Sequence, residues 1–538
     1  MPKHLFERSQ ATPRQERSGQ ALPDQEGTFT LSRRDMIGLI TGAFVAGSLP
    51  GWAMAAEAGK GGVLHVAAPA NPSSLDPATG GAGSDHVFLF TMFDTLVAWD
   101  YDTLSPRPGL AESWSFPDPK TLVLNLRQGV VFHDDTPFDA EAVKFNLERS
   151  KSAQRSNIKA DLATVDTVEA TGSHQVTLRL NQPDAALPLI LSDRAGMMCS
   201  PTALKQLGDE HDRRPVGAGP WKFESWANNE RIVVSRHPKY WRNGMPNLDG
   251  INFSIIPEVN TGLRSVVGGQ NQLAYQLSAQ QRPIIERARN LTGVVSPTLY
   301  CVQIYLNYGR EPLNDVRVRR ALNHAIDRET FLKATMAGMG DVAWMNLPPQ
   351  HWAYDKSLEN CWPHDPDKAR ALLSEAGYKD GFDLNLLGYT DQRSVQRQEV
   401  LIEQFRQAGI RCRFDNGSIA EKSSQYFAER KGDGLLSAWT GRPDPSLSYS
   451  LMYMKEAYFN AGRAEPSPEL TQALLASRST DDLEVRKREL AKVQKIVTDL
   501  ALMVPLYFQH ELVAHTDKVK NYESNLLGKP KFESVSLA

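Results

Sequence analysis

The segment 435–449, LLSAWTGRPDPSLSY, constrains the fold more than any other part of the chain. Its apolar start, 435–439, is typical of a buried strand, and Gly441 ends that strand. Asp444 followed by Pro445 is a helix-start signal, because a side-chain acceptor stands at the cap and proline at the first helical position. A strand that runs through a short loop into a helix N-terminus is where α/β proteins hold ligands, since unpaired backbone N–H groups point outward there.

The loop itself carries the groups of a candidate ligand site. Trp439 offers an aromatic face and Arg442 a fixed cation, with Thr440 and Gly441 between them and Asp444 behind them. We predict that this loop lines a cleft between two lobes built by the rest of the chain. Three alternatives stay open: Trp439 as a core side chain, Asp444 as a helix cap alone, and Arg442 paired with Asp444 or another surface acid.

Length and charge exclude several classes of protein. With 538 residues the chain is too long for one small core, and 41% hydrophobic with 23% charged residues is a globular composition. The net charge of −3, with acids and bases mixed along the chain, gives no electrostatic reason to bind nucleic acid or an anionic membrane.

The N-terminal region has the features of an export signal. Arg33-Arg34 precedes a weakly apolar run, 37–49, and Ala53-Met54-Ala55 provides a small-residue cleavage site. The run of about 13 residues is shorter than the ~20 that span a bilayer. We therefore predict a twin-arginine-type signal peptide with a disordered N-region over 1–55, and a periplasmic mature protein.

The four cysteines form no C-x-x-C motif, so no zinc, redox or other cofactor site is expected. Cys199 and Cys301 lie in apolar stretches and are expected to be free core thiols. Whether Cys361 and Cys412 form a disulfide after export stays open.

Helices and strands alternate along the chain, which indicates a mixed α/β sheet rather than a sandwich. The helix over 366–377 is well punctuated, with Asp365 at its cap and Gly377 at its end. A strand over 504–508 is expected to return the chain to the first lobe. Further strands are expected at 63–67, 121–126, 176–180, 231–235, 302–306, 383–387 and 410–414.

Several motifs resemble one family. PLNDVRVRRAL at 312–322 and AIDR at 325–328 are the clearest, and SLDP (74–77), FHDDTPF (132–138), GAGP (217–220) and Tyr240-Trp241 follow the same order. Together they resemble family 5 extracytoplasmic solute-binding proteins of bacterial ABC importers, the dipeptide-, oligopeptide- and nickel-binding type. The similarity covers residues 60–535.

The resemblance implies a two-lobed periplasmic-binding-protein fold of the cluster C type, with an extra subdomain in the first lobe and a hinged ligand cleft. The first lobe would comprise 56–300 and the returning segment 503–538, and the second lobe 301–502. It implies a monomeric receptor, not an enzyme, that passes its solute to membrane permease subunits.

One departure from the family pattern bears on the ligand. Relatives that take dipeptides have an acidic residue after Trp-x-Gly, where it holds the ligand's α-ammonium group. Here Trp439-Thr440-Gly441 is followed by Arg442, a cation that suits a carboxylate. We therefore expect a peptide-like or opine-like solute with an anionic group. Tyr300, Tyr305 and Trp344 are further candidate contacts that depend on fold analogy.

Enzyme interpretations find little support. His510 and His515 are five residues apart, which places them about 140° apart around a helix, so they cannot share a metal as an i, i+4 pair does. No nucleophile elbow or phosphate-binding loop is present in the sequence. The alternative function is a secreted hydrolase or a sensor subunit on the same scaffold.

Overall fold

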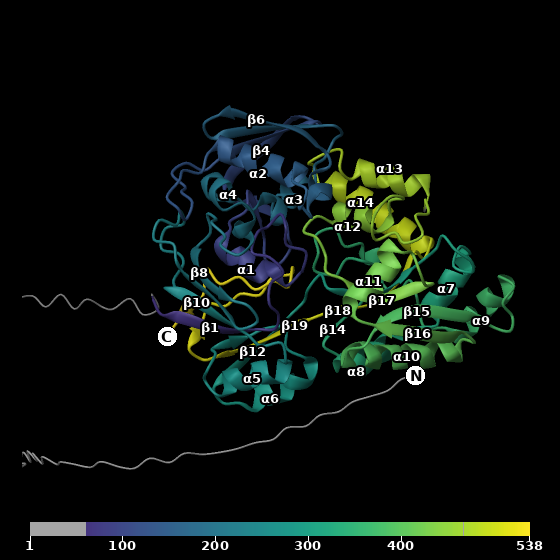
Figure 1. Ribbon diagram of the computed structural model, residues 1–538. Helices are drawn as coiled ribbons and strands as arrows, with labels where there is room; N and C mark the ends of the chain where they lie inside the picture. The colour runs from purple at the N-terminus through teal and green to yellow at the C-terminus, as the bar shows by residue number, and fades with distance from the viewer. Residues whose placement is uncertain (1–60, 466) are drawn as a thin grey trace, which may run out of the picture. The chain divides into compact units, whose positions relative to one another are not determined.

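Two mixed β-sheets organise the residues that the computed structural model describes, 61–465 and 467–538 (Figure 1). These residues belong to one compact unit. The predicted signal peptide over 1–55 lies outside the described residues. Among the helices of the described ranges, none is both long and apolar enough to span a bilayer.

The first sheet has seven strands in the order β12-β19-β11-β1-β10-β9-β8. β1 pairs in parallel with β10 and β11, and the other pairs are antiparallel. A four-stranded antiparallel sheet, β4-β5-β7-β6, matches the extra subdomain expected beside it. We call the region of these two sheets the first lobe. Its strands are β1 (Val63–Ala68), β4 (Ala111–Asp118), β5 (Thr121–Leu126), β6 (Val165–Gly172), β7 (Gln175–Leu180), β8 (Trp221–Ala227), β9 (Arg231–Arg236), β10 (Gly250–Ile255), β11 (Leu273–Ala274), β12 (Leu291–Ser296) and β19 (Glu511–Thr516).

The second lobe is the region of a six-stranded sheet, β14-β18-β13-β17-β15-β16. Its strands are β13 (Cys301–Leu306), β14 (Gly340–Val342), β15 (Asp383–Tyr389), β16 (Arg411–Gly417), β17 (Gly434–Trp439) and β18 (Met503–Gln509). The remaining short strands are β2 (Val97–Trp99), β3 (Pro106–Pro108), β20 (Val519–Lys520) and β21 (Ser536–Leu537).

Helices cover the sheets. In the first lobe they are α1 (Asp85–Met92), α2 (Ala140–Ser152), α3 (Leu187–Ile190), α4 (Pro201–Leu207), α5 (Val259–Val267) and α6 (Arg282–Arg287). In the second they are α7 (Val316–His324), α8 (Arg328–Met336), α9 (Pro366–Glu375), α10 (Gln392–Gln407), α11 (Ile419–Ser423), α12 (Pro445–Tyr453), α13 (Pro468–Ala476) and α14 (Leu483–Asp499).

Strand β13 explains why the second lobe has two cores. Every residue of β13 is buried. Val302 and Ile304 join a core with the helices α7, α8 and α10, whereas Cys301 and Tyr305 join an aromatic core with α12 and α14 (Figure 1). A central strand covered on both faces reads as a continuous apolar run, which is the pattern that predicted it.

Two crossover segments connect the lobes, one between β12 and β13 and the other between β18 and β19. They are hydrogen-bonded to each other: Thr298 Oγ1 donates to the Gln509 carbonyl at 2.6 Å, and the Gln509 N–H donates to the Tyr300 carbonyl at 2.9 Å. The prediction that 504–508 returns to the first lobe is wrong, because β18 pairs with β13 and β14 of the second sheet. The return comes one strand later, at β19.

The structure confirms two helix starts that local sequence signals predicted. Asp365 caps α9, where its carboxylate accepts from the Lys368 N–H at 2.8 Å. Asp444 caps α12 in the same way, accepting from the Ser446 N–H at 2.9 Å. Both helices carry proline at the first position, where the missing N–H would have had no partner.

Candidate functional site

The strand–loop–helix predicted from 435–449 is present as β17, a loop and α12. Trp439 is almost fully buried, and its Nε1 donates to the Ser448 hydroxyl at 3.2 Å. Gly441 has φ +78°, and a Cβ there would lie 2.4 Å from the Cβ of Leu299. Only glycine fits this position, which presses the loop against the first crossover segment.

The Arg442 side chain is half-buried and has no carboxylate partner among the described residues. Its Nη1 donates to the Gly441 carbonyl at 2.9 Å, and its Cζ lies 5.2 Å from the Trp439 ring centre. It forms no ion pair with any residue in the described ranges. Asp444 is fully buried and pairs with Arg486 at 2.7 Å, so the alternative pairing of Arg442 with Asp444 is wrong.

Arg442 acts electrostatically on groups of the first lobe. Burial raises the pKa of Asp161 to about 6, and the Arg442 guanidinium opposes that rise. Asp161 is half-buried and has no ion pair within the described residues. The charges of Asp161 and Arg442 therefore interact between the two lobes, although the two side chains form no ion pair with each other.

Lys529 is the third member of this group. It is buried, in the C-terminal segment that packs with the first lobe, and both Arg442 and Asp193 influence its charge. Burial lowers the pKa of Lys529 to about 8. We call Arg442, Asp161 and Lys529 the interlobe charge cluster.

The charges next to this cluster are already paired. Burial would raise the pKa of Asp193, but His86, at 2.7 Å, and the neighbouring cations hold it well below its usual value. Asp85 pairs with Arg194 at 3.1 Å. Asp161 and Lys529 gave no signal in the sequence, because only tertiary structure brings residues so distant in sequence near Arg442.

None of the other predicted contacts is hydrogen-bonded to this cluster within the described residues. Tyr305 is buried in the aromatic core, with its ring 5.2 Å from that of Phe427, which does not favour a ligand contact. Tyr300 is 36% exposed, yet its surroundings raise its pKa, first by burial. Trp344 borders a separate hollow of about 500 Å³ beside α8 and β14, with Arg328 5.5 Å from its ring centre.

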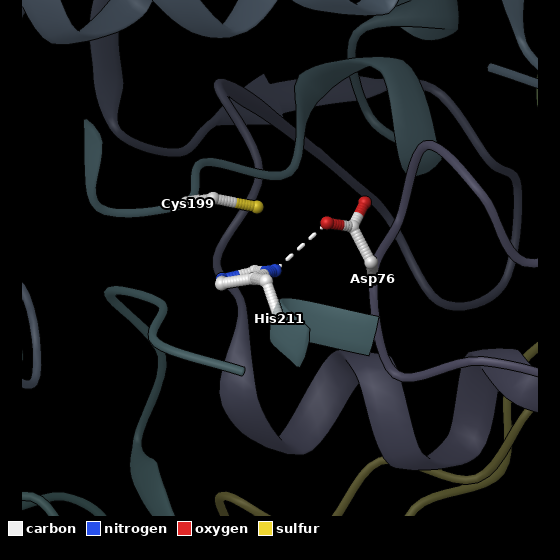
Figure 2. Close-up of side chains that lie close together, drawn as sticks. All are labelled: Asp76, Cys199 and His211. Atoms are coloured by element: carbon white, nitrogen blue, oxygen red, sulfur yellow. Dashed lines mark hydrogen bonds and ion pairs between the residues drawn. The ribbon is translucent and has the colours of Figure 1, made fainter. Parts of the chain in front are cut away.

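A second cluster of titratable residues, Asp76, Cys199 and His211, lies inside the first lobe (Figure 2). His211 Nδ1 is hydrogen-bonded to Asp76 at 2.7 Å, and its Nε2 accepts from the Val216 N–H at 3.2 Å, so both ring nitrogens have partners. Asp76 also accepts from Arg149 at 2.8 Å. Because both ring nitrogens and the carboxylate are engaged, this cluster suits a structural role better than a metal site. All four cysteines are free, including Cys361 and Cys412.

The sequence profile of bacterial extracellular solute-binding proteins, family 5 middle region, matches residues 105–460. The chain belongs to this family. The resemblance noted in the sequence is thereby confirmed, and the chain is a solute-binding protein of the ABC-importer type for peptides or related solutes.

Curated relatives support the assignment. The glutathione-binding protein GsiB of Salmonella paratyphi A is 30% identical over 476 residues, which cover 85% of this solute-binding protein and 91% of GsiB. GsiB of Shigella flexneri is 29% identical over the same shares of the two chains.

Solved structures show the same fold. The ABC transporter-associated periplasmic binding protein DppA of Helicobacter pylori, in complex with the peptide STSA, is 25% identical with a TM-score of 0.79, covering 89% of this chain and 98% of DppA. AgaA of A. tumefaciens R10, in complex with agropinic acid, is 22% identical with a TM-score of 0.76, covering 89% and 99%. The predicted two-lobed α/β fold is confirmed.

Proposed function

We propose that this chain is the periplasmic, monomeric receptor of an ABC importer and binds a small peptide-like or opine-like solute through an anionic group held by Arg442. The receptor encloses the solute between its lobes, leaves it chemically unchanged and delivers it to permease subunits. Thr440 and Gly441 form the wall beside the guanidinium, and Trp439, buried in the aromatic core, lies behind the guanidinium with its ring centre 5.2 Å from Arg442 Cζ.

The observation that carries this proposal is Arg442 itself. It stands at the β17–α12 junction with no acid as partner in the described residues, although its charge acts on two carboxyl groups, those of Asp161 and Asp193. Guanidinium binds carboxylate with two parallel hydrogen bonds, and the α12 N-terminus adds positive potential. Asp161 offers a carboxyl for an ammonium group on the same ligand.

Glutathione is the first compound to test, because the GsiB relatives are named for binding it. It is a tripeptide with two carboxylates and one ammonium group, and this pattern of charge suits a site with two cations and one acid. AgaA, which binds agropinic acid, shares the fold alone and makes opine-like conjugates the next compounds.

The experiment is native mass spectrometry of protein purified from its own periplasm, followed by calorimetry with glutathione and with any co-purified compound. We expect Arg442→Met to weaken binding by about 10- to 100-fold, the value of a charge-assisted hydrogen bond. Arg406→Met is the matched control, because Arg406 is an exposed cation of the same lobe that pairs with Glu403. Equal affinity in the two variants would remove Arg442 from the site.

The alternative, a secreted hydrolase or a sensor subunit on the same scaffold, separates cleanly in the same samples. A receptor gives stoichiometric heat, and the ligand is recovered intact after long incubation. Turnover of glutathione or of a co-purified amide or ester would favour the hydrolase instead.

A further inference from the structure

Lys529 is a buried cation that lacks an acid. Its side chain is 7% exposed, and its ammonium makes neither a hydrogen bond nor an ion pair with the residues described. We propose that one carboxylate of the ligand bridges Lys529 of the first lobe and Arg442 of the second, so that the anion itself links the lobes. This inference rests on the proposed function, since it concerns the same solute.

The loops that carry the two cations pack against the same crossover residues, 298–299. Gly441, just before Arg442, has φ +78°, and a Cβ there would lie 2.4 Å from the crossover side chains. Gly528, just before Lys529, has φ +67°, and its Cβ would lie 2.8 Å from them. The two cations lie on loops from opposite lobes, and each is one residue away from a close contact with the crossover residues 298–299.

The backbone of Lys529 is held in place before any ligand arrives. Asn525 Nδ2 donates to the Lys529 carbonyl at 2.8 Å, and the Lys529 N–H donates to Asn525 Oδ1 at 3.3 Å. Pro530 further restricts the backbone of the residue before it. A flexible lysine stem on a fixed backbone loses less entropy on binding than one on a mobile tail.

The acids near Lys529 already have partners. Four charged side chains influence its protonation: Asp85, Asp193, Arg194 and Arg442. Asp193 accepts from His86 at 2.7 Å, and Asp85 pairs with Arg194 at 3.1 Å. Among these groups Lys529 and Arg442 are left over, and a buried ammonium without a counter-ion is unfavourable.

The two cations act on each other. Burial lowers the pKa of Lys529 to about 8, and Arg442 is the first of the neighbouring cations that lower it further. At neutral pH the lysine is still mostly charged, so two positive groups from opposite lobes repel in the ligand-free molecule. A carboxylate between them replaces that repulsion with two charge-assisted contacts.

This arrangement couples closure to the charge of the ligand. Opening moves the lobes, and the two cations with them, apart, so repulsion favours the open form when no anion is bound. A ligand shifts such an equilibrium only by its differential affinity for the two states. Here the difference in affinity arises because the ligand's carboxylate can contact both Arg442 and Lys529 only in the closed form.

The first test needs no ligand. Small-angle X-ray scattering of the ligand-free protein is compared for the wild type, Lys529→Met and Lys531→Met. Lys531 is the matched control, because it lies in the same segment but pairs with Glu533 at 3.3 Å. We expect a smaller radius of gyration for Lys529→Met at pH 7 and low salt, and the same contraction in the wild type as pH rises above 8. A radius unchanged by Lys529→Met would overturn the inference.

The second test measures the bridge directly. Calorimetry with glutathione and with its monoethyl glycyl ester is carried out on Lys529→Met, Arg442→Met and the double variant. We expect each single substitution to weaken glutathione binding by about tenfold or more. The double variant should lose less than the product of the two, because both side chains hold the same carboxylate.

The outcomes separate the two proposals. Weakened binding in Arg442→Met with unchanged binding in Lys529→Met overturns the bridge and leaves the proposed function standing. Unchanged binding in both variants overturns the proposed function. A strictly multiplicative loss in the double variant also overturns the bridge, because the two cations would then hold different groups.

Discussion

The molecule contains two clusters of titratable groups that differ in one respect. Both carboxylate oxygens of Asp76 and both ring nitrogens of His211 have partners, and the Asp76 side chain is completely buried. In the interlobe charge cluster, Arg442, Asp161 and Lys529 have no oppositely charged partner among the described residues, and two of the three keep some exposure. The first cluster has the properties of a structural element, whereas the second has the uncompensated charges that the proposed solute site requires.

The comparison teaches that perturbed titration alone does not identify a site. Burial shifts the pKa of groups in both clusters, but only the unpaired groups have donors or acceptors left for a solute. Three substitutions can break or sharpen this distinction through their effect on stability, and they follow from the largest effect to the smallest.

Asp76→Ala should have the largest effect. It strands Arg149 and His211, so we expect the free energy of unfolding to fall by about 3–5 kcal/mol, as for other broken buried pairs. Burial would raise the pKa of Asp76, but His211 and Arg149 hold it well below its usual 3.8, so its stabilisation is complete above about pH 4 and declines as pH falls further toward the folded pKa. Urea unfolding at pH 7 and pH 3 measures both. If the difference in unfolding free energy between wild type and Asp76→Ala were the same at the two pH values, Asp76 would not act as an ionised partner.

Glu511→Gln should have an intermediate effect of the opposite sign. Glu511 is buried at the start of β19, its Oε1 has no partner in the described residues, and burial raises its pKa to about 8. Because the folded value exceeds the usual 4.5, stability is complete below pH 4.5 and declines as pH rises to 8.

The variant should therefore gain stability relative to the wild type by an amount on the order of 3 kcal/mol at pH 9, and by little at pH 4. Thermal unfolding across this range checks the prediction, with Glu286→Gln, an exposed helix pair with Arg282, as control. Parallel curves for the two variants would show that Glu511 has an unseen partner.

Lys529→Met should have the smallest effect on folding. Because Lys529 has no oppositely charged partner, its removal leaves no other buried charge unpaired. We therefore expect the free energy of unfolding to stay equal or rise by about 1 kcal/mol or less. Chemical unfolding of the ligand-free protein measures it. A loss as large as that of Asp76→Ala would place Lys529 with the structural cluster.

Much of this architecture could be predicted from the sequence. Asp365 and Asp444 cap their helices as expected, and the apolar run of β13 gives a central strand, because these signals are local. The sheet of β18 was predicted wrongly, since an apolar strand fits either sheet and only pairing decides. Arg442 was recognisable within one motif. Asp161 and Lys529 were not, because they lie hundreds of residues apart and meet only through the fold.

The double crossover has a consequence for how the receptor moves. The two connecting segments are tied to each other by the bonds between Thr298, Tyr300 and Gln509. A change of backbone angle in one crossover segment must then be matched in the other, so we expect the two segments to bend together. We expect two connected segments of this kind to permit rotation about one axis and to resist twisting, so that the same faces of the two lobes would meet each time they close.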